Sequence, residues 1–167
     1  MGRLAQTLGL TITFFPTWNT MDAYLIVGEA NTRKSSVLRS LTGCFNRSNR
    51  DILLTNGKKL AIYARVASLQ ESKTTPTAFI IEALATGQST VIFCLWPGPN
   101  PLNPTSFPDA AAYVQAFQQA GWLFKAGAVL GGTPYRPATP RVANFSQVPL
   151  QPINVAASAV RSHFRWQ

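Results

Sequence analysis

The chain has 167 residues, with 15 lysines and arginines against six acidic residues, so its formal net charge is +9. This length suits one domain with a sizeable core, and the basic surface favours polyanionic partners such as nucleotides, nucleic acid or anionic lipid. Cys44 and Cys94 are the only cysteines and lack metal-ligand spacing, which indicates a reducing cytosol rather than a disulfide framework.

Residues 1–20 are mildly apolar, with Arg3 as their only charge. They are too short and too polar for a transmembrane helix, and they fit a signal peptide poorly. We expect an added arm, or an upstream reading of the start codon, before a single domain of residues 21–167. Residues 11–15 could add a strand at the sheet edge. Because no transmembrane segment follows, the prediction is a cytoplasmic protein without a membrane span.

A near match to a phosphate-binding loop follows a short apolar run at 23–27. Gly28, Lys34 and Ser35 fall on their positions in the pattern G-x-x-x-x-G-K-[ST], and Arg33 replaces the second glycine. Lys34 would place its ammonium on the terminal phosphates, and Ser35 would ligate Mg²⁺ through its hydroxyl. The candidate binding residues are Gly28, Glu29, Ala30, Asn31, Thr32, Arg33, Lys34, Ser35 and Ser36.

Arg33 is the departure from the pattern. A glycine at this position normally lets the backbone approach the phosphates without a side chain in the way. An arginine there needs a shifted loop, adds a second cation to the site, or folds back and occupies the pocket. All three alternatives remain open at the level of sequence.

The rest of the chain alternates between strand and helix signals. The predicted strands are 23–27, 52–55, 60–66, 90–96 and 122–130, with Asn56-Gly57 as a hairpin turn. The predicted helices are 35–41, 76–85, 108–120 and 154–166, the last with Asn154 as its N-cap. A loop rich in proline and arginine is expected at 133–152. The fold class is therefore α/β, with three layers: a mainly parallel sheet, one antiparallel hairpin strand, and helices on both faces.

The segment 28–43, which reads G-E-A-N-T-R-K-S-S-V-L-R-S-L-T-G, resembles the first motif of the Era-like GTPases. In that family, within the Ras-like P-loop class, the pattern is roughly G-x-P-N-x-G-K-S-S-L-x-N-x-L-x-G. Ala30 replaces the proline and Arg33 the glycine. The resemblance implies a Ras-like P-loop domain, shortened by about one strand–helix unit, that binds GTP or ATP with Mg²⁺ at the carboxyl ends of its strands.

Two later GTPase motifs have no counterpart in this chain. The D-x-x-G motif is missing where residues 66–71 read V-A-S-L-Q-E. The guanine-reading motif N/T-K-x-D is missing at both candidate places, 96–100 and 131–135. The resemblance therefore implies phosphate binding, but neither guanine specificity nor hydrolysis, and the catalytic residues remain unassigned.

Few residues offer acid–base chemistry. Glu29, Asp51 and Glu71 are the candidates for an acid near the phosphates. The alternative without a functional role is that Glu29 is a solvated loop residue, Asp51 marks the start of a strand, and Glu71 marks a turn. Glu82 is predicted on a helix surface. His163 is expected to have a surface or packing role, because no neighbouring carboxylate would orient it as a base.

Basic residues gather in groups that suit a polyanion. These are Arg33, Arg39, Arg47 and Arg50 near the loop; Arg136 and Arg141 in the proline-rich segment; Lys58 and Lys59 at the hairpin tip; and Arg161 and Arg165 at i, i+4 on the last helix. Phe164 and Trp166 lie among the last group. We favour their packing on the sheet over stacking with nucleic acid.

Three functions are compatible with these patterns. The preferred one is a degenerate GTPase-like switch or regulatory module that binds a nucleotide and a protein partner, with weak or no hydrolysis. The second is a competent small NTPase or kinase, with Lys34 as phosphate clamp, Ser35 on Mg²⁺, and Glu71 or Asp51 as the acid. The third is a pseudo-nucleotide fold, closed by Arg33, that binds a protein or nucleic acid through its basic surface.

Overall fold

The computed structural model describes residues 20–132 and 135–166, so the edge strand expected at 11–15 lies outside the described residues. The strands are β1 (Asp22–Val27), β2 (Arg47–Leu53), β3 (Lys59–Arg65), β4 (Thr90–Leu95), β5 (Leu123–Leu130) and β6 (Val142–Phe145). The helices are α2 (Lys34–Thr42), α3 (Pro76–Ala85), α4 (Ala110–Gln119), α5 (Ile153–His163) and the short 3₁₀ helix η1 (Val148–Leu150).

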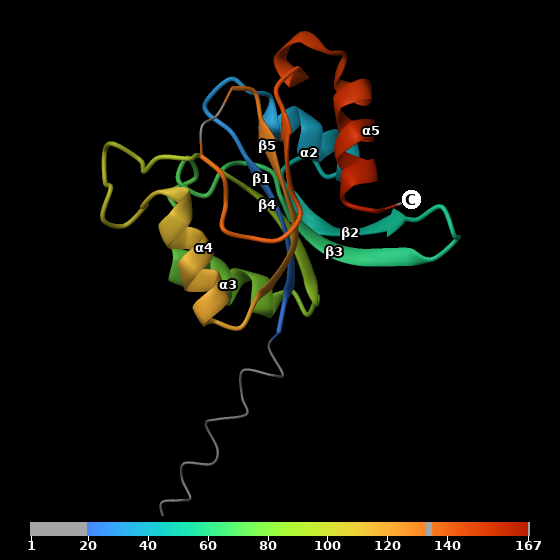
Figure 1. Cartoon of the computed structure of the whole chain (residues 1–167). Helices are drawn as coiled ribbons and strands as arrows, with labels where there is room; N and C mark the ends of the chain where they lie inside the picture. The colour runs from blue at the N-terminus through green and yellow to red at the C-terminus, as the bar shows by residue number, and fades with distance from the viewer. Residues whose placement is uncertain (1–19, 133–134, 167) are drawn as a thin grey trace, which may run out of the picture.

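The strands form one mixed sheet in the order β2-β3-β4-β1-β5-β6 (Figure 1). Every pairing is parallel except the β2–β3 hairpin, which confirms a mainly parallel α/β sheet with one antiparallel pair. Because β4 lies between β1 and β3, the segment after β3 reaches the loop after β1 only by crossing the end of β4. The carboxyl ends of the parallel strands meet at one edge, where ligands bind in open α/β sheets.

Helices cover both faces of this sheet. On one face α2 and α5 pack side by side, and their aliphatic residues meet Ile26, Ile62 and Ile92. On the other face α3 and α4 enclose an aromatic core. In this core the ring centroid of Phe93 in β4 lies 5.1 Å from that of Phe79 and 5.3 Å from that of Phe117. Since every residue of β4 is buried, its continuous apolar sequence fits a central strand covered on two sides.

Local signals fix several element ends as predicted. Helix α3 has the predicted bounds, and Thr75 caps it by accepting the N–H of Ala78 at 3.1 Å. Asp109 caps α4 in the same way. Gly43 ends α2 with a positive φ of 71° and donates its N–H to the carbonyl of Arg39 at 2.8 Å.

Other expectations were wrong. The proline-rich segment contains β6 and η1 as well as loop, and β2 begins at Arg47 rather than at residue 52. Helix α5 starts after Pro152, so Asn154 lies inside it and is not the N-cap. Arg165 follows the end of α5 with a φ of 60°, so it does not share a helix face with Arg161. Within residues 20–132 and 135–166, no helix combines the length and apolarity that a membrane span needs.

Candidate functional site

Residues 28–33 form a tight loop between the end of β1 and the start of α2. Gly28 donates its N–H to the carbonyl of Leu95 at 3.2 Å, and a Cβ on Gly28 would lie only 2.3 Å from Thr32 Oγ1. Crowding therefore requires glycine at this position. The carbonyl of Glu29 organises the turn, because it accepts both the N–H of Thr32 at 3.3 Å and its hydroxyl at 2.7 Å.

Lys34 is the first residue of α2, and its side chain points into the loop. It is 6% exposed, and its ammonium donates to the same Glu29 carbonyl at 2.8 Å. Burial lowers the pKa of Lys34, while Cys94 and Glu71 act in the opposite direction. Among the described residues, the carbonyl of Glu29 is the one hydrogen-bond acceptor of this ammonium, so its buried charge is poorly compensated, and an anionic ligand would compensate it.

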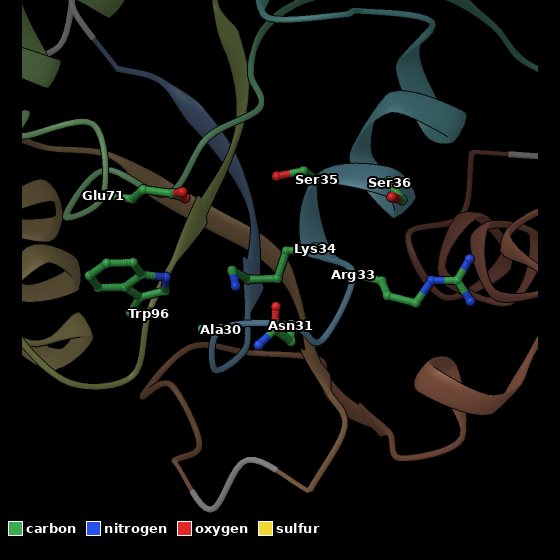
Figure 2. Close-up of a pocket in the computed structure, with 8 residues that line it drawn as sticks. All are labelled: Ala30, Asn31, Arg33, Lys34, Ser35, Ser36, Glu71 and Trp96. Atoms are coloured by element: carbon green, nitrogen blue, oxygen red, sulfur yellow. The ribbon is translucent and has the colours of Figure 1, made fainter.

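Arg33 lies at the left-handed position that a glycine would fill, with a φ of 69°. Its guanidinium donates to the carbonyl of Gln151 at 2.7 Å, just before α5. Figure 2 shows this side chain pointing away from Lys34, on the opposite side of the loop. Of the three alternatives, the structure contradicts one, because the Arg33 side chain does not fold back into the pocket, although Arg33 belongs to the lining of the cavity over this loop.

A cavity of about 250 Å³ opens over this loop (Figure 2). It is lined by Ala30, Asn31, Arg33, Lys34, Ser35 and Ser36, together with Glu71 and Trp96. The structure thus brings six of the nine predicted binding residues to one cavity, while Gly28, Glu29 and Thr32 shape the loop. The hydroxyl of Ser35 and the carboxylate of Glu71 point toward each other across the cavity in Figure 2.

The start of α2 supplies further binding capacity. No side chain caps this helix at Arg33, and its first turn contains no acidic residue. The first amides of a helix lack intrahelical acceptors and carry a partial positive charge. Beside a buried lysine, they form a site for an anion.

Comparison with models of protein families, with curated proteins and with solved structures finds no match to this chain.

Of the three candidate acids, only Glu71 lines the cavity. Asp51 is exposed on β2, which β3 and β4 separate from β1, so the structure does not bring it to the loop. The carboxylate of Glu29 belongs to an exposed residue outside the cavity lining.

Of the two places considered for a guanine-reading motif, 131–135 includes undescribed residues. In the other, the side-chain amide of Asn100 donates to the carbonyl of Gln70 at 2.9 Å.

Gln70 is a functional neighbour that the sequence did not reveal. It is fully buried; its Oε1 accepts the N–H of Trp96 at 3.0 Å, and its Nε2 donates to the carbonyl of Trp96 at 2.9 Å. These two bonds tie the segment after β3 to the segment after β4. Glu71 and Trp96 are therefore held together at the cavity. One indication of this part of the site was present in the sequence, because Trp96 directly follows a buried central strand and ligands bind at the carboxyl ends of such strands.

A partly buried ion pair supports the segment that carries Glu71. Arg65, at the end of β3, lies 2.8 Å from Glu82 of α3, and it also donates to Ser72 at 2.9 Å and Thr74 at 2.7 Å. The side chain of Arg65 is 4% exposed and that of Glu82 is 22% exposed. Glu82 thus lies on helix α3, partly exposed as predicted, and it is also a structural partner of Arg65. Tyr63 also donates its hydroxyl to Glu82.

The remaining candidates have packing roles. The Nε2 of His163 lies 2.8 Å from the carbonyl oxygen of Arg141 and 3.1 Å from that of Gly127, and its N–H donates to them. The imidazole ring also contacts Phe145. Phe164 and Trp166 are both 1% exposed and pack on Tyr24 of β1, which confirms packing over an exposed stacking surface.

Several arginines bind backbone carbonyls. Arg39 donates to Phe45 at 2.9 Å and lies over its ring. Arg161 donates to the carbonyl of Leu53. These contacts hold loops and strand ends, and the charges they carry still contribute to a positive surface.

Proposed function

We propose that this chain binds the phosphate chain of a nucleoside triphosphate, with Mg²⁺, in the cavity over residues 28–36, as a P-loop-type module. The observation that carries the proposal is the ammonium of Lys34. It is buried beside an uncapped helix start and has a lowered pKa. Burying a charge costs stability, and ionisable groups with perturbed pKa values in clefts cluster at functional sites, which supports a ligand here.

The residues present fit a triphosphate chain. The amides at the start of α2 would bind its oxygens, and Lys34 would reach the terminal phosphates, as a lysine does in phosphate-binding loops. The left-handed backbone at Arg33 supports this assignment, because the arginine keeps the turn of a glycine and points its side chain elsewhere. A cavity of about 250 Å³ suits the phosphates and leaves the nucleoside at the protein surface.

Mg²⁺ would be held by the oxygens of Ser35 and Glu71, which face each other, and by the phosphates. Mg²⁺ usually takes one or two protein oxygens together with phosphate and water. When bound, the ion neutralises charge on the phosphate chain. The sequence lacks the N/T-K-x-D motif that reads a guanine base, so we expect weak discrimination between GTP and ATP.

The function that follows is a nucleotide-dependent switch or regulatory module in the cytoplasm, with a protein partner and slow or absent hydrolysis. The position of Glu71 favours one alternative, a competent NTPase, because a carboxylate faces Ser35 at the end where the terminal phosphate would lie. Hydrolysis that is lost in Glu71→Gln while triphosphate binding persists would establish that alternative.

Calorimetry of ATP and GTP binding, with and without Mg²⁺, tests the proposal on the full chain. Lys34→Ala should abolish binding, whereas the control Lys58→Ala, which removes the same charge at the exposed hairpin tip, should leave it unchanged. Equal losses in both variants would indicate a general attraction to the basic surface. No binding to the unmodified chain would refute the proposal and favour a basic protein- or nucleic-acid-binding module.

A further inference from the structure

Trp96 closes the cavity on the side opposite Lys34. It directly follows β4, is half-buried, and lines the same cavity as Lys34 and Glu71. Both its backbone N–H and its carbonyl are fixed by Gln70, at 3.0 and 2.9 Å. The backbone that carries the indole ring is thus held in place before any ligand arrives.

The indole nitrogen of Trp96 faces the ammonium of Lys34 across the cavity in Figure 2. Within residues 20–132 and 135–166, the hydrogen bonds of Trp96 are made by its backbone, and its indole N–H has no acceptor. An indole N–H and an ammonium are both donors and never acceptors. Acceptor oxygens placed between two facing donors would bind both of them, and an anionic group supplies stronger acceptors than water does.

We propose that Trp96 donates its indole N–H to the terminal phosphoryl group of a bound nucleoside triphosphate. This inference rests on the proposed function, and it deepens that function by making the site selective for triphosphates over diphosphates. The lysine of a phosphate-binding loop reaches the last two phosphates, so the side chain opposite Lys34 meets the end of the phosphate chain. Gln70 links this contact to the segment that carries Glu71.

Calorimetry with Mg²⁺ and ATP or ADP tests the inference on Trp96→Phe, which keeps an aromatic ring and removes the N–H. Losing one hydrogen bond to a charged group should weaken ATP binding about tenfold. ADP binding should change less than about twofold, because the lost bond is absent from that complex. Leu102→Ala is the matched control: this residue lies in the same segment after β4, is 84% exposed, and does not line the cavity.

A second measurement uses the unmodified chain and does not depend on the variant folding. The chain has four tryptophans, each with an indole N–H signal in a ¹H–¹⁵N spectrum. The signal of Trp96 should move downfield on adding Mg²⁺ and ATP, and not with ADP.

Four outcomes would overturn the inference. Equal losses for ATP and ADP in Trp96→Phe would mean that the ring only packs in the cavity wall. Unchanged ATP binding in that variant, or an unmoved indole signal at saturating ATP, would remove the contact and leave the proposed function standing. If the unmodified chain binds neither nucleotide, the proposed function and this inference fail together.

Discussion

Replacing Gly28 by alanine should destabilise the protein through a single crowded contact. The new Cβ would lie 2.3 Å from Thr32 Oγ1 and 3.2 Å from Lys34 Cγ, so the Thr32 side chain must move. That movement disturbs the hydrogen bond from Thr32 to the carbonyl of Glu29 at 2.7 Å. Overpacking of this kind costs about 1–3 kcal/mol. In a protein of this size the melting temperature falls by about 2–4 °C for each kcal/mol.

A second substitution isolates the cause. Thr32→Ala removes the clashing oxygen and one hydrogen bond, so alone it should cost about 1 kcal/mol. The double variant Gly28→Ala/Thr32→Ala should lose less unfolding free energy than the sum of the two single losses, by about 1–2 kcal/mol. The four free energies of unfolding can be measured by urea titration followed by tryptophan fluorescence.

Gly98→Ala is the matched control, because a Cβ there meets nothing within 4 Å. It should be neutral or stabilise the protein by up to about 1 kcal/mol, since alanine has less conformational freedom when unfolded. If Gly28→Ala costs no more than Gly98→Ala, or if its cost and that of Thr32→Ala add fully, crowding at the loop is not the reason for glycine.

Three further predictions concern buried charges and thiols. Lys34→Met should raise the free energy of unfolding at pH 7 by about 1 kcal/mol in denaturant titrations, since it removes a buried charge from a candidate site. Because the pKa of Lys34 is lowered from 10.5 in the folded state, stability should rise with pH between that lowered value and 10.5, and Lys34→Met should lack this rise. Glu82→Gln should cost about 3 kcal/mol in thermal or urea unfolding by leaving the buried Arg65 without an anion, and an unchanged stability would contradict the role given to this pair. Cys94 and Cys44 should react with Ellman's reagent only on unfolding, since both are buried and burial raises the pKa of the Cys94 thiol to about 12; fast labelling of the native protein would oppose this.

Local signals in the sequence were enough to predict much of the architecture. The Asn56-Gly57 turn was predicted from its dipeptide. The caps that the structure shows at Thr75 and Asp109, and the glycine at 43, also act through neighbouring residues, and the helices they bound lie close to the predicted ranges. Strand β6 was missed because its four residues show no clear alternation, and it is stabilised by parallel pairing with β5.

Contacts between distant segments could not be predicted in the same way. The spacing of Gly28, Lys34 and Ser35 identified the loop from one short segment. The pairing of Arg65 with Glu82 requires α3 to be placed against the end of β3, and the sequence contains no local mark of that contact. The position of Trp96 opposite Lys34 similarly depends on β4 lying next to β1.

The strand order also has a consequence for the synthesis of the protein on the ribosome. Strand β1 is made first among the described strands, yet both of its neighbours, β4 and β5, are made much later. Until Leu123–Leu130 has emerged, β1 has at least one unpaired edge, although the β2–β3 hairpin can already form from adjacent residues. Long-range parallel pairing is slow and leaves strand edges exposed in the meantime. A nascent chain cut short before β5 should therefore be prone to aggregation, and the loop of residues 28–33 would take its final form only late in synthesis.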